Sequence, residues 1–293
     1  MTFFSNDFKK ILTHGGTFHA DEVFATAWLI YSINLDSSKV ERTFRISEED
    51  LNDPNVLVYD IGGKDHAANN NFDHHMKGGV MRASGIPFSS FGLVFDAFPM
   101  KGMTEFVEEI IRHKIVYPID IIDNGVGEKG ELPEYSLSQV VSSFNSLDGK
   151  NNDLCFGEAV RFAIDLLNRE IALAKKQERD ISGVLNSEII EGKILVMDEC
   201  YAGWQKTVLN EFSENMLYAI YPGLRGGYMI QCVPAEEGSF VTRKPFPIEL
   251  AGLRDAELQE KCGVKDAMFI HPGRFIGGAE SVAGCLAMAR LAL

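Results

Sequence analysis

Two short apolar runs in the first quarter of the chain each lead into a pair of glycines. The run Lys9–Thr13 precedes the turn His14–Gly16, and the run Asn55–Ile61 precedes Gly62–Gly63. Apolar runs without polar alternation are typical of strands buried on both faces of a parallel sheet. Apolar residues at helical spacing follow the first turn over Ala20–Ile33. This order of strand, glycine turn and helix predicts an alternating α/β domain.

Further helices complete the predicted first domain, and a change of pattern marks its end. They are expected at residues 88–97 and 104–116 and, longest of all, over Cys155–Asp180. The end of the long helix predicts a domain boundary at residue 182, which gives domains 1–182 and 183–293. We expect a parallel-sheet domain with helices on both faces, a smaller C-terminal α/β domain with a smaller sheet and fewer helices, and an active site in the cleft between them. The predicted elements of the second half are strands at 193–197, 216–221, 228–233 and 267–270, a weaker helix at 249–262 and a helix at 280–293.

The charge balance limits the partners of such a chain. Its 28 Lys and Arg against 42 Asp and Glu give a formal net charge of -14, and no basic run exceeds two residues. This argues against broad, tight binding of a duplex, which needs a basic face. An enzyme that takes one strand end at a metal site is not excluded, because bound cations change the local charge. The five cysteines are widely spaced and never form a CxxC pair, which indicates reduced thiols and excludes a structural zinc finger.

The expected location follows from what the sequence lacks. No apolar run reaches the roughly 18 residues that span a bilayer. Charged residues from Asp7 onward closely follow Phe3 and Phe4, so we expect no signal peptide. The glycine-rich acidic stretch Gly125–Glu134 is expected to be a surface loop. We expect a soluble, cytoplasmic protein without a membrane partner; no pattern indicates its oligomeric state.

Histidine and carboxylate residues gather where the predicted strands end. In open α/β sheets, ligands bind at this carboxyl edge. Imidazole and carboxylate ligands without thiolate favour Mn, Fe, Zn or Mg over a structural zinc site. Their number suggests two ions that share a carboxylate, the arrangement used for in-line displacement at phosphorus. A lone histidine is more simply a core or loop residue, but packing alone hardly explains a set spread over several segments: His14, His19, Asp21, Asp60, Asp73, His74, His75, Asp120 and Asp123.

These segments also resemble a known family. The triplet Asp73-His74-His75, preceded by Asp60 and by the His14…Asp21 segment, resembles the DHH phosphoesterase superfamily. Longer motifs more specifically resemble the melanocyte-proliferating-gene-one family and cover nearly the whole chain. They are Thr13–Leu29, Val58–Gly63, Phe72–His75, Arg82–Gly85, Ile119–Gly125, Thr242–Pro247 and Phe269–Gly278.

The resemblance implies two sets of metal ligands. One ion would be held by His14, His19 and Asp60. The other would be held by Asp21, the shared Asp60, His74 and Asp123, with Asp120 as the alternate to Asp123. His19 stands where the wider superfamily usually has aspartate, so the site is less negative and its metal preference or one ion's affinity could change. We expect two Mn²⁺ ions, with Mg²⁺ or Zn²⁺ as alternatives.

Two further residues near the ligands have implied roles in the reaction. Asp73 would orient the adjacent imidazoles. His75 would face the substrate as general acid or as a phosphate contact. A hydroxide that bridges the metals is the nucleophile that the resemblance implies.

The second half would supply the substrate contacts. Gly277 and Gly278 resemble a glycine-rich loop whose backbone N–H groups cradle an anion near the final helix, and an ordinary turn is the alternative. Arg243 and Lys244, beside two prolines, are a candidate phosphate clamp or else a solvated pair. Glu280 stands where the family more often has lysine, which weakens the case for phosphate binding there. Arg82 and Arg274 are further phosphate candidates.

The resemblance implies a 3′–5′ exonuclease that acts on single-stranded RNA or short oligonucleotides. The residues alone support only metal-dependent phosphoester hydrolysis. A small-molecule phosphatase acting on pyrophosphate or a dinucleotide is the first alternative, favoured by the acidic charge. A non-catalytic metal-binding interaction protein is the second, and His19 in place of aspartate keeps it open.

Overall fold

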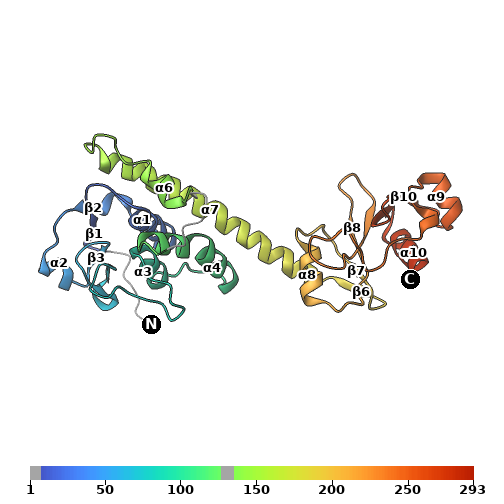
Figure 1. Cartoon of the computed structure of the whole chain (residues 1–293), viewed down its shortest axis with the longest axis horizontal. Helices are drawn as coiled ribbons and strands as arrows, with labels where there is room; N and C mark the ends of the chain where they lie inside the picture. Colours follow the sequence, from blue (N-terminus) through green and yellow to red (C-terminus); the bar gives the residue numbers. More distant parts are fainter. Residues whose placement is uncertain (1–7, 127–134) are drawn as a thin grey trace. The chain divides into compact units, whose positions relative to one another are not determined.

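A computed structural model describes residues 8–126 and 135–293 (Figure 1). The chain divides into two compact units, residues 1–174 and 175–293. The division falls inside helix α7 (Asn152–Leu185), the same helix in which the predicted boundary at residue 182 lies. Phe3, Phe4 and Asp7, and most of the loop predicted over Gly125–Glu134, lie outside the described residues.

The first unit is built on a five-stranded sheet in the order β2-β1-β3-β5-β4. Three of its pairings are parallel, and only β4 runs antiparallel, at the edge. This confirms the expected parallel sheet. Every residue of β3 is buried, as befits a strand covered on both faces. The strands are β1 (Lys10–His14), β2 (Val40–Thr43), β3 (Val56–Tyr59), β4 (Asp65–His66) and β5 (Asn71–Phe72).

Helices cover both faces of this sheet, as predicted. On one face α1 (Ala20–Ile33) packs against α3 (Ser90–Ala97), and Trp28 and Phe91 enter the main core. On the other face Leu51 of the short helix α2 packs with Leu12 and Val58. The remaining helical elements of this unit are α2 (Glu48–Asn52), α4 (Glu105–Ile111), a π-helical turn (Arg112–Val116), α5 (Tyr117–Asp123), α6 (Leu137–Ser142) and the 3₁₀ turns Ser37–Lys39 and Ala67–Asn69.

One predicted feature of this unit is wrong. The apolar run that contains Asp120 and Asp123 does not end a strand but forms helix α5. The π-helical turn continues the chain from α4 into α5, and a proline near the start of α5 suits the first turn of a helix. Both carboxylates are therefore carried by a helix that reaches the sheet edge from the side.

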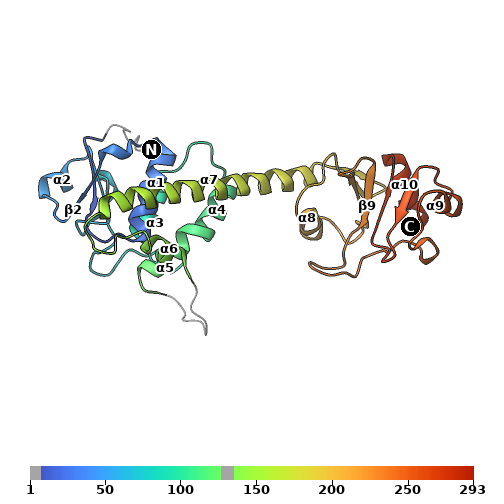
Figure 2. The same cartoon turned by 90° about the horizontal axis from the view of Figure 1, so that it is seen from above.

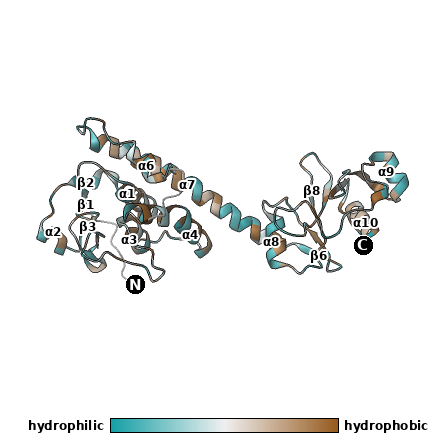
Figure 3. Ribbon diagram, in the orientation of Figure 1, coloured by the Kyte–Doolittle hydropathy of each residue, from teal (hydrophilic) through white to brown (hydrophobic). Residues whose placement is uncertain are grey.

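Helix α7 explains where the first core ends. Its residues Phe156, Ala163 and Leu167 belong to that core. The sequence then becomes polar over residues 175–180, and Figure 3 shows hydrophilic residues along this part of the helix. Among the described residues, no helix combines the length and the apolar character needed to cross a membrane.

The second unit holds a six-stranded sheet in the order β10-β11-β9-β8-β7-β6. Its pairings are antiparallel except that of β7 with β8. Helix α10 packs on β9 beside it (Figure 2). The elements are β6 (Glu188–Ile190), β7 (Ile194–Val196), α8 (Trp204–Glu211), β8 (Tyr218–Pro222), β9 (Tyr228–Cys232), a 3₁₀ turn (Ile248–Leu250), α9 (Asp255–Cys262), β10 (Ala267–Ile270), β11 (Ile276–Ala279) and α10 (Val282–Ala292).

Two expectations for this unit need correction. Its sheet is not the smaller one, since it has six strands against five among the described residues. Gly277 and Gly278 do not form a loop but lie in β11, between β10 and β9. A Cβ at Gly277 would lie 2.8 Å from the carbonyl oxygen of Phe269, and one at Gly278 would lie 2.9 Å from the Phe269 ring. The two glycines therefore allow the neighbouring strand to pack closely.

Candidate metal centre

The histidine and carboxylate segments meet at one edge of the first sheet. Strand β1 ends at His14, β3 is followed by Asp60, and β5 is followed by Asp73-His74-His75. These three strands are parallel neighbours, so their carboxyl ends share an edge. Helix α1 begins directly after His19 and brings two carboxylates in its first turn to the same place.

One group of donor atoms forms around His14. Its Nε2 lies 3.4 Å from Oε1 of Glu22 and 3.6 Å from Oδ2 of Asp60. Donor atoms of His14, His19, Glu22 and Asp60 all lie within 4.8 Å of one another. The backbone N–H of His19 donates to Oε2 of Glu22 at 2.9 Å, which leaves Oε1 facing the group. Glu22 is not among the ligands predicted from the sequence, although it directly follows Asp21.

A second group forms around His74. Its Nε2 lies 3.0 Å from Oδ2 of Asp123, 3.8 Å from Oδ2 of Asp21 and 3.8 Å from Oδ1 of Asp60. Asp60 thus faces His14 with one carboxylate oxygen and His74 with the other. A single carboxylate lies between the two groups, as the sharing of one ligand by two ions requires.

The carboxylates of these groups are buried without enough hydrogen-bond donors. The side chains of Asp21 and Asp60 are each 1% exposed, and that of Glu22 is fully buried. Both oxygens of Asp21, Oε1 of Glu22 and Oδ2 of Asp60 accept no hydrogen bond from any residue that the structure describes. A buried charge without a partner is costly. Carboxylate oxygens together with imidazole nitrogens suit a divalent cation, so the residues present fit a metal.

The pKa values of the site agree with this reading. Burial, followed by the nearby charge of Asp123, raises the pKa of Asp21 to about 6. Burial and the neighbouring carboxylates also raise the pKa values of Glu22 and Asp60 well above their usual range. Burial lowers the pKa of His14, which favours the neutral imidazole that a metal needs. Without a cation these carboxylates hold protons to a higher pH than usual, and a bound cation would reverse this shift.

Asp60 is held in an unusual backbone conformation. Its φ angle is 58°, in the left-handed region that few residues other than glycine adopt. Its backbone N–H donates to the carbonyl oxygen of Phe72 at 3.3 Å, and Ser90 Oγ lies 3.4 Å from its Oδ1. Such strain persists where the surrounding structure enforces it, and it concentrates at functional sites.

Asp73 and His75 form a pair at the border of the second group. Oδ1 of Asp73 lies 2.8 Å from Nδ1 of His75 and accepts from the His75 backbone N–H at 3.1 Å. Burial raises the pKa of Asp73, but these bonds and the N–H of Gly63 outweigh it and lower the pKa overall. The hydrogen bond to Asp73 raises the pKa of His75, whose side chain is 59% exposed. Asp73 therefore orients the imidazole of His75 through Nδ1, and the rest of the side chain is largely open to solvent.

Asp120 lies apart from both groups of donors. Its Oδ1 accepts from the backbone N–H and the hydroxyl of Ser89, at 3.0 and 2.5 Å. Its Oδ2 lies 2.7 Å from Nη1 of Arg82. The side chain of Arg82 is only 8% exposed, and its guanidinium lies 3.7 Å from the centre of the Phe88 ring. Of the two alternates, Asp123 lies at the donor groups, whereas Asp120 and Arg82 pair with each other.

The substrate-side candidates of the second unit make structural contacts. Arg243 Nη1 donates to the carbonyl oxygens of Ser213 and Met216, both at 3.0 Å. Arg274 has a left-handed φ of 59°, and its Nη1 donates to the carbonyl oxygen of Phe246 at 3.2 Å. Lys244 is exposed. Their part in phosphate binding stays a prediction.

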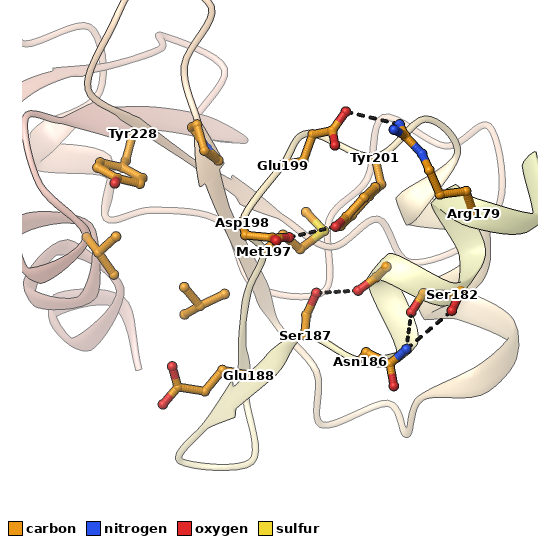
Figure 4. A pocket seen from close by; sticks show the side chains of 14 residues that line it. Arg179, Ser182, Asn186, Ser187, Glu188, Met197, Asp198, Glu199, Tyr201 and Tyr228 are labelled. Atoms are coloured by element: carbon orange, nitrogen blue, oxygen red, sulfur yellow. Dashed lines mark hydrogen bonds and ion pairs between the residues drawn. The ribbon is translucent and has the colours of Figure 1, made fainter. Parts of the chain in front are cut away.

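A pocket of about 780 Å³ lies in the second unit (Figure 4). None of the donor residues described above lines it. Many of its polar groups pair with one another: Tyr201 donates to Asp198 at 2.6 Å, and Arg179 donates to Glu199 at 3.1 Å (Figure 4). The volume of this pocket does not indicate a reaction or a ligand. The donor groups of the first unit therefore remain the candidate site.

Comparison with known proteins gives one match over nearly the whole chain. Residues 10–293 match the model of the MYG1 exonuclease family, which is described as an uncharacterised protein family (UPF0160). The MYG1 exonuclease of Rattus norvegicus is 28% identical over 97% of this chain and 84% of its own. The MYG1 protein of Chlamydia muridarum is 30% identical over 94% of both chains.

Similarity to solved structures is weaker. The pGpG-specific phosphodiesterase PggH from Vibrio cholerae aligns over 92% of both chains with a TM-score of 0.31 and 11% identity. RecJ from Thermus thermophilus aligns over 97% of this chain and 48% of its own, with a TM-score of 0.25 and 14% identity. Scores this low support no argument about fold or activity.

Proposed function

Since this chain belongs to the MYG1 exonuclease family, we propose that it is a divalent-metal-dependent phosphodiesterase that removes nucleotides from the 3′ end of single-stranded RNA or short oligonucleotides. The name exonuclease, given to several relatives, supports a hydrolase of phosphodiester bonds. The observation that carries the proposal is the convergence of two groups of histidine and carboxylate donors on the buried carboxylate of Asp60.

The donor groups suggest which residues would hold the metals. His14, His19, Glu22 and Asp60 would hold one ion. His74 and the three carboxylates nearest its Nε2, those of Asp21, Asp60 and Asp123, would hold the other. Two Mn²⁺ ions suit this mixture of imidazole and carboxylate, with Mg²⁺ or Zn²⁺ as alternatives. A bound pair supplies the Lewis acidity and the activated water for in-line displacement at phosphorus.

The chain's own residues then position the substrate and supply a proton. Asp73 holds His75 through Nδ1, so Nε2 on the opposite side of the ring is the nitrogen left to meet the substrate. The raised pKa of His75 increases the protonated fraction at neutral pH. His75 would donate this proton to the leaving oxygen.

The acidic charge supports a second candidate. A net charge of -14 disfavours long nucleic acids and leaves a small phosphorylated substrate, such as pyrophosphate or a dinucleotide, as the alternative. Such a substrate needs only the local field of the metals.

A cleavage assay tests the proposal. Single-stranded RNA labelled at its 5′ end is incubated with the protein and Mn²⁺, Mg²⁺ or EDTA. We expect a ladder that shortens from the 3′ end only with metal, and a loss of about 100-fold or more in Asp60→Asn, because the altered side chain serves both groups. The same change at exposed Asp165→Asn should leave the rate unchanged.

Other outcomes separate the alternatives. Hydrolysis of pyrophosphate or a dinucleotide without degradation of RNA would support the small-molecule phosphatase. Tight Mn²⁺ binding without any hydrolysis would support a non-catalytic metal-binding protein. An Asp60→Asn protein with near-normal turnover would contradict the shared-ligand arrangement.

A further inference from the structure

A second feature shares the sheet edge of the donor groups. Strands β1 and β2 are parallel neighbours in which His14 pairs with Thr43. The next residues, Gly15 and Phe44, therefore leave the sheet side by side, and the Gly15 N–H donates to the carbonyl oxygen of Thr43 at 2.8 Å. A ligand bound beside Gly15 would therefore contact the residue that directly follows His14.

A pocket of about 250 Å³ opens at this point, entirely within the first unit. Gly15, Gly16, Arg42 and Phe44 line one side, and residues 149–154 line the other. Sites that enclose a whole drug-sized ligand measure roughly 300–1,000 Å³. A pocket below this range suits one part of a larger ligand, such as a single nucleobase.

Phe44 is the prominent side chain of this pocket. It is 81% exposed, which is costly for an aromatic ring. One side of the ring lies on the glycine turn: a Cβ at Gly16 would be 3.0 Å from Cε1 of Phe44, and one at Gly15 would be 3.4 Å from Cε2. The two glycines let the ring rest on the backbone beside His14. A single exposed phenylalanine needs no explanation, but this one belongs to a pocket beside the donor groups.

The pocket is lined by one buried and one exposed basic side chain, Arg42 and Lys150. Arg42 donates to the carbonyl oxygen of Gly16 at 2.9 Å and lies 2.8 Å from Asp153. Its side chain is 4% exposed, and its guanidinium lies 4.6 Å from the centre of the Phe156 ring. Lys150 is 80% exposed, and its Nζ lies as far as 4.0 Å from the carboxylate of Asp148. Its ammonium group is therefore accessible to an anion.

We propose that this pocket binds the nucleoside next to the cleaved bond, with its base stacked on Phe44 and Lys150 beside the adjoining phosphate. The proposal rests on the proposed function and adds a substrate class, single-stranded nucleotides with an accessible base. Stacking on an aromatic ring tolerates every base, since each has a π-face. A degradative enzyme that removes residues regardless of sequence needs this kind of contact.

A pair of small probes isolates the base. Binding of AMP and of ribose 5-phosphate, which lacks the base, is measured by calorimetry with Mn²⁺. The wild-type protein should prefer AMP, and Phe44→Leu should reduce this preference about 5- to 150-fold, which corresponds to the roughly 1–3 kcal/mol of a base–aromatic stack. Phe44→Trp should keep the preference. The control is Phe240→Leu, at a ring that is 99% exposed in the second unit, and it should change nothing.

The outcomes distinguish this proposal from the function on which it rests. A wild-type protein that cleaves RNA but binds both probes equally, or neither, overturns the base pocket alone. Loss of preference in Phe240→Leu as well as Phe44→Leu also overturns it, because the effect is then not local. A clear AMP preference that depends on Phe44, in a protein that hydrolyses no nucleic acid, supports the pocket and overturns the exonuclease.

Discussion

Glu22 and Asp120 are both fully buried carboxylates of the first unit, yet their surroundings differ. Asp120 accepts two hydrogen bonds from Ser89 and pairs with Arg82. Glu22 directs Oε1 toward the imidazole of His14, with no hydrogen-bond donor for it among the residues described. The carboxylate of Asp120 is therefore satisfied by the protein, whereas Oε1 of Glu22 has no donor among the described residues.

This difference predicts opposite effects of removing the charge. Glu22→Gln should stabilise the metal-free protein at high pH, where the buried carboxyl group of Glu22 must ionise, and should weaken Mn²⁺ binding about 10-fold or more. Asp120→Asn should instead lower the free energy of unfolding by about 3–5 kcal/mol, because it leaves Arg82 buried without its partner, while Mn²⁺ binding persists. Unfolding in EDTA and calorimetric titration with Mn²⁺ measure both. Equal effects of the two variants would contradict the assignment.

The residues of the site were predictable to different degrees. His14 and Asp60 stand at the ends of strand-like runs, His74 belongs to the Asp73-His74-His75 triplet of the resemblance, and the structure brings the three together at one edge. Glu22 was missed because the predicted ligand set followed the family resemblance, which assigns only Asp21 of this segment as a ligand. Both are buried because α1 begins at the sheet edge and its first turn is enclosed. Periodicity within one element does not contain that information.

Helix α7 contains two glycines whose surroundings differ, Gly157 and Gly183. A Cβ at Gly157 would meet nothing within 4 Å, whereas one at Gly183 would lie 2.2–2.6 Å from the ring of Tyr201. Glycine inside a helix costs roughly 0.5–1 kcal/mol relative to alanine. At Gly183 the absence of a side chain lets the ring of Tyr201 pack directly against the helix, which offsets this cost.

Alanine substitutions should therefore have opposite signs within one helix. Gly157→Ala should raise the free energy of unfolding by about 0.5–1 kcal/mol, because it restricts the unfolded chain without a clash. Gly183→Ala should lower it by about 1–3 kcal/mol, because Tyr201 must move. Urea unfolding followed by circular dichroism measures both, and stabilisation by both would refute the packing at Tyr201.

Long periodic elements were predictable, and short apolar runs were ambiguous. The pattern of Ala20–Ile33 defined α1 with the bounds found in the structure. The run before Asn124 has the composition of a strand, and only its continuation from the π-helical turn makes it a helix. Gly277 and Gly278 are typical of a turn, but in β11 they leave room for the ring and backbone of Phe269. This contact is set by the pairing of β10 with β11, which the local sequence pattern does not reveal.

The buried carboxyl groups of the first unit make the stability of the whole metal-free molecule depend on pH. Asp21 has a pKa of about 6 in the folded chain, against about 4 for an unperturbed aspartate. Between these values the folded state binds more protons than the unfolded state, so the free energy of unfolding falls as pH rises. Asp60 and Glu22 act in the same direction.

We therefore expect a dependence on pH that metal reverses. In EDTA, the midpoint of thermal unfolding should fall from pH 5 to pH 8, with Asp21 alone contributing on the order of 1 kcal/mol over this range. With Mn²⁺ it should rise over the same range, because the ligands must lose their protons to bind. Calorimetric scans at several pH values measure this, with Glu22→Gln as a variant of reduced slope. Parallel curves with and without metal would rule out these carboxylates as ligands.

The left-handed backbone of Asp60 also has an evolutionary consequence. Asparagine tolerates a φ near the 58° of this residue, whereas most other replacements, β-branched ones above all, would strain it. Aspartate and asparagine codons differ by one base, and their side chains have the same shape. A single mutation can thus silence the centre while the fold survives. Descendants of such a protein that keep the scaffold for another purpose should carry asparagine at this position.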